Sequence, residues 1–109
     1  MEQADSLRHA TKLLELVSYQ DGSIVSRTVI KSPNGSVTAF AFDKNQEISE
    51  HTVPYDALVY ILDGEAEIRI SGVVHKMGSG DAILMPANEP HAVKATQRFK
   101  MLLSMVRKP

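Results

Sequence analysis

The stretch from His51 to Gly64 constrains the fold more than any other part of the chain. It begins with a histidine, turns at Pro54 and continues into the apolar run Ala-Leu-Val-Tyr-Ile-Leu at residues 57–62. Residues 57–61 of this run are too few for a helix of ordinary length and are rich in types that favour strands, so they predict a strand buried on both faces. Asp63-Gly64 follows directly and is a strong signal for a β-hairpin turn.

Short strand patterns separated by turn residues fill most of the remaining chain. Residues 1–16 differ, because their apolar side chains recur at spacings of three and four and favour a short helix. The pattern predicts an all-β sandwich or barrel, preceded by a short N-terminal helical or extended segment. The expected strands, besides the one at 57–61, cover residues 24–31, 37–42, 47–52, 65–71, 73–77, 82–85, 91–95 and 98–106.

Length and composition exclude several classes of protein. The chain has 109 residues, enough for one compact domain, so we expect a single domain over 1–109 with its barrel core at about 24–106. Twelve basic and thirteen acidic residues leave no excess of positive charge for binding nucleic acid. There is no cysteine, which excludes disulfides and thiolate metal sites. Neither a membrane span nor a signal peptide is evident, and we expect a cytoplasmic protein.

A segment near the end of the chain carries residues at a recognisable spacing. Gly80 is followed by Pro86, and His91 stands five positions after that proline. This spacing resembles the second motif of the cupin superfamily, which has a glycine, a proline and a histidine at these intervals. Asn45 and Asn88 stand where the family motifs have glycine, and asparagine also accepts left-handed φ.

The stretch that ends at Gly64 resembles the first cupin motif. That motif places two histidines around one residue, then a glutamate, then a glycine. Counted back from Gly64, the glutamate position is Ala57 and the paired histidine positions are His51 and Val53.

The resemblance covers about residues 37–105 and implies a small single-domain cupin of the RmlC-like, conserved-barrel type. Such proteins are double-stranded β-helix or jelly-roll barrels, are often dimers, and many hold a metal in the barrel mouth. The family's metal ligands are the two histidines and the glutamate of the first motif and the histidine of the second. Carried over by position, His51 and His91 remain, whereas Val53 and Ala57 cannot coordinate a metal. The resemblance therefore implies an intact scaffold with a half-dismantled metal site.

Two imidazoles can hold a divalent ion weakly, whereas catalytic zinc and iron sites usually take three protein ligands. The expected cofactor, if a third ligand exists outside the motifs, is a divalent transition metal such as zinc, iron, manganese or nickel. The alternative is that His51 and His91 bind an organic ligand by hydrogen bonds, or act on it as general acid and base. The nearest candidates for a third ligand by sequence are Gln46, Glu47, Glu50 and His75.

Small apolar side chains at the lost ligand positions would enlarge and dry a pocket beside the histidines, as a site for a small organic molecule requires. For most of the apolar pocket residues, plain barrel core is the better interpretation. The expected pocket residues are His51, Val53, Ala57, Val59, Phe40, Phe42, Met85, His91, Val93 and Met101.

The outward-facing side chains of the apolar run must also be shielded from solvent. If Ala57 and Val59 point into the barrel, then Leu58, Tyr60 and Leu62 point out. An exposed apolar patch usually marks an interface. The N-terminal segment or a second subunit could cover it, and we expect a homodimer because two-fold pairs are the commonest oligomers.

The sequence supports three hypotheses of function. The first is a small-molecule-binding cupin of unassigned ligand, with at most a weak divalent metal at the two histidines. The second is a small metal-dependent cupin enzyme of oxygenase, isomerase or lyase type, with His51 and His91 as its catalytic residues. The third is a structural or interaction protein, supported only by the outer apolar face. Because proteins with this fold catalyse many different reactions, the fold alone does not distinguish between these hypotheses.

Overall fold

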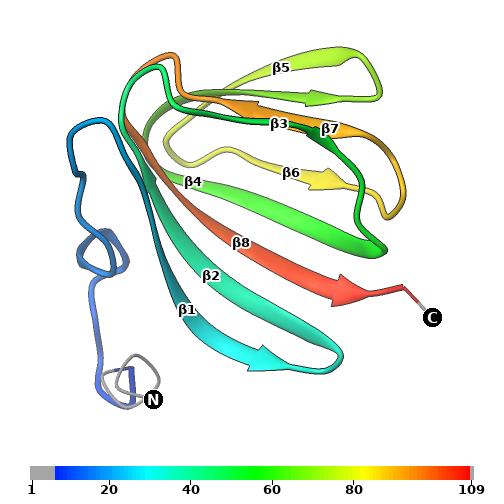
Figure 1. Cartoon of the computed structure of the whole chain (residues 1–109). Helices are drawn as coiled ribbons and strands as arrows, with labels where there is room; N and C mark the ends of the chain where they lie inside the picture. Colours follow the sequence, from blue (N-terminus) through cyan, green and yellow to red (C-terminus); the bar gives the residue numbers. More distant parts are fainter. Residues whose placement is uncertain (1–6, 109) are drawn as a thin grey trace.

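Eight antiparallel strands curl into a barrel made of two facing sheets (Figure 1). The computed structural model describes residues 7–108. This architecture confirms the predicted all-β jelly-roll fold. The strands are β1 (Ile24–Ser32), β2 (Gly35–Phe42), β3 (Glu47–His51), β4 (Tyr55–Ile70), β5 (Val73–Gly78), β6 (Ala82–Met85), β7 (His91–Lys94) and β8 (Phe99–Arg107).

The long strand β4 belongs to both sheets. Its first half pairs with β8 and β6, and β8 continues through β2 to β1, which gives the first sheet. Its second half pairs with β5 and β7, and β7 continues to β3, which gives the second sheet. β4 therefore joins the two walls of the barrel, as its course in Figure 1 shows.

The expected hairpin at Asp63-Gly64 is wrong, because β4 runs through this dipeptide without a turn. The register against β8 shifts between Ile61 and Asp63, which marks a β-bulge that bends the strand. Gly64 has φ +80°, and a Cβ at this position would lie 1.8 Å from the carbonyl oxygen of Arg98. The Asp-Gly dipeptide therefore bends β4 without ending it, whereas a hairpin turn would have ended the strand at this point.

The N-terminal segment was expected to be helical or extended, and residues 1–6 of it lie outside the described part of the chain. Only Leu13–Glu15 forms a single 3₁₀ turn, and the rest of the segment is irregular. Leu16 and Val17 are buried against Ala39 and Ala41 on the outer face of the first sheet. Packing on the sheet decides this conformation, because an isolated short helix has little stability of its own. No helix within residues 7–108 is long and apolar enough to cross a membrane.

Tyr19 fixes the N-terminal segment over the bend of β4. Its hydroxyl donates a hydrogen bond of 2.6 Å to Asp63, and the side chains of Arg98 and Lys100 lie over its ring. Burial, followed by the hydrogen bond and the charge of Asp63, raises the pKa of the Tyr19 hydroxyl. The tyrosine therefore stays protonated as a donor to the residue before Gly64.

The barrel interior is a single apolar core. The Phe42 and Phe99 rings stack with centroids 4.5 Å apart. Alternate residues of β4 and β8 contribute to this core, which is the pattern that a strand with one inward face requires. The core comprises Phe42, Ala57, Val59, Ile61, Ala66, Ile68, Ile70, Met77, Met85, Val93, Ala95, Phe99 and Met101.

The outer face of the first sheet remains partly uncovered. Leu58, Tyr60 and Leu84 are 46%, 38% and 54% exposed, so the described part of the N-terminal segment, from residue 7 on, covers only part of this face. A cavity of about 460 Å³ separates the 3₁₀ turn from Tyr60 and Leu62. The side chains of Leu58 and Tyr60 therefore point away from the barrel interior, as the sequence predicts.

We propose that this face pairs with the same face of a second copy, as the sequence predicts. Leu58→Glu combined with Leu84→Glu would place charges in the interface and should convert a dimer, at twice the 12.0 kDa chain mass, into a monomer. Light scattering coupled to size exclusion measures this change. Val74→Glu is the control, because Val74 is 43% exposed on the second sheet. A wild-type monomer, or a dimer that survives the double substitution, would contradict the proposal.

The bend at Gly64 gives a second prediction. Gly64→Ala should lower the free energy of unfolding by well more than the about 1–2 kcal/mol that a left-handed conformation alone costs a non-glycine residue. The reason is the overlap of the new Cβ with the Arg98 carbonyl. Gly72→Ala is the matched control, because Gly72 has φ +83° and open space around its Cβ position. Urea denaturation measures both, and equal losses would show that the close approach does not matter.

Candidate functional site

The two motif histidines lie side by side at one end of the barrel, which we call the mouth. His51 is the last residue of β3 and His91 the first of β7, and the two form a cross-strand pair. Their ring centroids are 4.3 Å apart and the rings meet edge to face, at 64°. The structure therefore brings these two predicted residues together.

Each histidine is oriented by a backbone carbonyl. Nδ1 of His51 lies 2.9 Å from the carbonyl oxygen of Ser49, and Nδ1 of His91 lies 3.3 Å from that of Glu89. A carbonyl oxygen only accepts hydrogen bonds, so Nδ1 carries the proton of each neutral ring. The Nε2 atoms are then unprotonated. The mouth therefore offers two nitrogen lone pairs, either as hydrogen-bond acceptors or as metal ligands.

The two rings differ in their surroundings. His91 is only 5% exposed, whereas the side chain of His51 is exposed to solvent. Burial lowers the pKa of His91, the Glu89 carbonyl partly offsets this, and the charge of His51 lowers the pKa further. His91 is therefore a neutral imidazole at pH 7.

Hydrogen bonds tie the two mouth loops to each other. The carboxylate of Asp56 accepts a bond of 2.9 Å from the backbone N–H of Ala87. The N–H of Asn88 donates a bond of 2.8 Å to the carbonyl oxygen of Val53. Asn88 has φ +67°, the left-handed conformation expected for a residue in a glycine position. These bonds fix the loop that precedes His91, and sequence reasoning assigned no such role to Asp56.

The first sheet supplies the facing wall of the mouth. Ala57, at the lost glutamate position, is 1% exposed and stands between Met85 of β6 and Met105 of β8 in the strand register. Most of the expected pocket residues lie in the apolar core, so their role as pocket walls stays a prediction. Met105 was not among them. Its inward face is evident from alternation, but only the strand register shows that it neighbours Ala57.

The donor atoms at the mouth do not fit the metal site of the family motif. Within residues 7–108, no group of three or more His, Asp or Glu side chains is placed to hold a metal ion. Glu47 pairs with Lys94 and lines a cavity of about 70 Å³ on the second sheet. His75 pairs with Ile68, and β4 separates its strand from β7. Neither completes a ligand set with the two histidines, and Glu50 lies exposed on β3.

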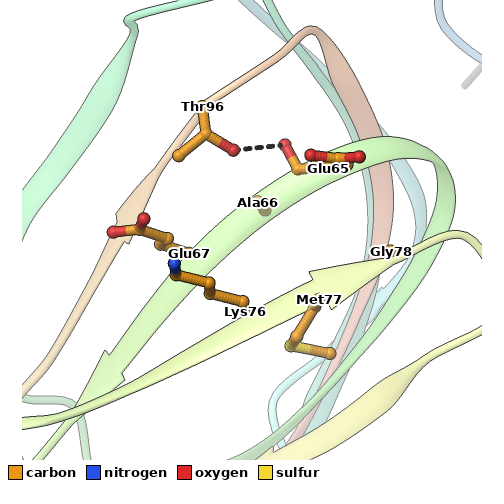
Figure 2. A pocket seen from close by; sticks show the side chains of 7 residues that line it. All are labelled: Glu65, Ala66, Glu67, Lys76, Met77, Gly78 and Thr96. Carbon is orange, nitrogen blue, oxygen red and sulfur yellow. Dashed lines mark hydrogen bonds between the residues drawn. The ribbon is translucent and has the colours of Figure 1, made fainter.

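A further cavity, of about 370 Å³, lies at the other end of the second sheet (Figure 2). Glu65 and Glu67 of β4, Lys76 of β5 and Thr96 line it, and the Thr96 hydroxyl donates to the carbonyl of Glu65. Glu65 is five residues from the mouth end of β4, roughly 16 Å along an extended strand. This charged depression is therefore separate from the histidine pair.

Comparison with known proteins places the chain in a family. A model described as Cupin domain matches residues 39–106. A conserved protein of unknown function from Streptococcus pyogenes is 38% identical, with a TM-score of 0.89 over 93% of this chain and 89% of that one. A cupin superfamily protein from Desulfitobacterium hafniense is 26% identical, with a TM-score of 0.87 over 92% of both chains.

A cupin 2 conserved barrel domain protein from Leptotrichia buccalis is 41% identical, with a TM-score of 0.84. That match covers 86% of this chain but only 46% of the Leptotrichia protein. The chain therefore spans about half the length of that protein. No protein with a curated description matches the chain at a significant level. The family match over most of the barrel and the two motif histidines at its mouth lead to one conclusion: the chain belongs to the cupin family.

Proposed function

We propose that this chain is a small-molecule-binding cupin whose ligand enters the barrel mouth and contacts His51 and His91. The observation that carries the proposal is the edge-to-face pair of imidazoles, 4.3 Å apart, with both Nδ1 atoms directed at backbone carbonyls. Such a pair is fixed in orientation before any ligand arrives, which lowers the entropic cost of binding.

The state of the two rings defines the class of ligand. Both Nε2 atoms accept hydrogen bonds when the rings are neutral, so the ligand must bring donors. The wall opposite the pair is apolar, with Ala57 and Met85 buried there. A small organic molecule with hydroxyl, phenol or protonated acid groups on an apolar body meets both conditions. The cytoplasmic location expected from the sequence stays a prediction.

A metal-dependent cupin enzyme is the second candidate, and the two Nε2 lone pairs favour it. Two neutral imidazoles without a carboxylate form only a weak site for a divalent ion. Mass-spectrometric elemental analysis of untagged protein, purified without chelator, distinguishes the candidates. Near-stoichiometric zinc, iron, manganese or nickel would favour the enzyme, and protein that is free of these metals would favour the organic ligand.

Ligand binding gives the direct test. A thermal-shift screen of small alcohols, phenols and organic acids should find compounds that raise the melting temperature of the wild type. His91→Asn and His51→Gln should remove this shift, because each deletes an acceptor at the mouth. His75→Gln should keep it, since His75 lies on β5 away from the pair. A hit that binds all three variants equally would place the ligand outside the mouth.

The buried histidine predicts a dependence of stability on pH. The pKa of His91 is lowered in the folded state, so the unfolded chain binds its proton more readily. The contribution of this neutral histidine is therefore complete above the ordinary pKa of about 6.5 and declines as pH falls below it. The free energy of unfolding of the wild type, relative to His91→Asn, should decrease between pH 7.5 and 5.5. A difference that stays constant in urea titrations would contradict the lowered pKa.

A further inference from the structure

The turn that joins β4 to β5 contains a serine in a conformation that suits glycine better. Ser71 and Gly72 form this two-residue turn between Ile70 and Val73, and they adopt φ +48° and φ +83°. Glycine reaches positive φ without steric cost, whereas the Cβ of any other residue makes this conformation unfavourable. A strained backbone position of this kind is a reason to ask what its side chain does.

Ser71 makes two hydrogen bonds to the segment just before His91. Its hydroxyl donates a bond of 2.9 Å to a carboxylate oxygen of Glu89, and its backbone N–H donates one of 2.8 Å to the carbonyl oxygen of Pro90. Because Ser71 and Glu89 are both exposed, water competes for the hydroxyl bond and the bond adds little to stability. A glycine at position 71 would keep the backbone bond and relieve the strain. The serine therefore adds the hydroxyl bond alone, and this bond does little for the stability of the fold.

These two bonds hold the peptide group that orients the buried imidazole. The carbonyl oxygen of Glu89 lies 3.3 Å from Nδ1 of His91, and it belongs to the peptide between Glu89 and Pro90. Ser71 binds the chain on both sides of that peptide, at the side chain of Glu89 and at the carbonyl of Pro90. The proline ring fixes φ at residue 90, so little freedom remains between the two points. The strand register places the turn here, because Ile70 pairs with His91.

We propose that Ser71 is a positioning residue that, through Glu89, keeps Nε2 of His91 a hydrogen-bond acceptor. The partner of one ring nitrogen decides which nitrogen carries the proton of a neutral imidazole. If the Glu89 carbonyl is displaced, the proton can move from Nδ1 to Nε2, and the ring then offers the mouth a donor in place of an acceptor. The selection of ligands that bring donors rests on the function proposed above, whereas the tautomer is a property of the ligand-free protein.

Nitrogen-15 NMR of the histidine rings tests the proposal in ligand-free protein at about pH 8, above the ordinary pKa of histidine. The wild type should show His91 protonated at Nδ1. Ser71→Gly and Glu89→Ala should each give a population of Nε2-protonated His91 that the wild type lacks. The double variant should show no more of it than either single variant, because both substitutions remove the same bond. Glu89→Gln keeps an acceptor oxygen and should retain the wild-type tautomer.

The chain offers two controls. His51 is an internal one, because its Nδ1 faces the carbonyl of Ser49 on β3, and its tautomer should stay the same in every variant. Ser79→Ala is the matched substitution, since it removes the hydroxyl of another exposed turn serine. That hydroxyl donates a bond of 3.1 Å to the carbonyl of Leu62, beyond the far end of β5, and its loss should leave His91 unchanged.

Urea denaturation separates this role from a purely structural one. Ser71→Gly should leave the free energy of unfolding nearly unchanged, because relief of the strained φ offsets the loss of an exposed hydrogen bond. Glu89→Ala leaves the turn itself intact and gives the same test if the turn variant folds poorly. An unchanged His91 tautomer in these variants overturns the proposal, as does a wild-type His91 protonated at Nε2 or an equal change in Ser79→Ala. Any of these results would leave the ligand site standing, and failure of the ligand screen would leave the tautomer result standing.

Discussion

The passage of β4 from one sheet to the other is the constraint on which the rest of this structure depends. The strand leaves the mouth at Tyr55, bends at Gly64 and returns to the mouth at Ile70. One continuous strand therefore places both Ala57 and Ile70 at the end where the histidines lie. The bend requires a residue without a Cβ, because the carbonyl of Arg98 occupies the space that a side chain would need. The position of the site thus depends on backbone packing at the opposite end of the barrel.

The two histidines at the mouth are held by contacts with the backbone around them. Backbone carbonyls of Ser49 and Glu89 orient the remaining imidazoles, and the hydrogen bond from Ala87 to Asp56 holds the loop before His91. None of these contacts involves the lost ligand positions. The direction of the histidines therefore does not depend on the side chains of Val53 and Ala57.

Much of the fold could be predicted from the sequence because its signals are local. Strand alternation and turn residues predicted nine strands; seven of them match observed strands to within a few residues, and those at 57–61 and 65–71 are the two halves of β4. Asn45 and Asn88 adopt the left-handed φ expected from their glycine positions. Two features that local sequence signals did not specify depend on longer-range packing. Asp63-Gly64 is a bend because β8 lies against it, and the N-terminal segment is irregular because Leu16 and related residues bury on a sheet that forms elsewhere in the chain.

By itself, the sequence determined the class of fold, the family motifs and the identity of the two surviving histidines, because these follow from residue types at fixed spacings. Only the tertiary structure decided that the rings lie 4.3 Å apart and that their Nδ1 atoms face carbonyls. Only the strand register decided that Ala57 has a methionine on each side. Register is a relation between strands distant in the chain, and the packing of side chains across the whole barrel fixes it.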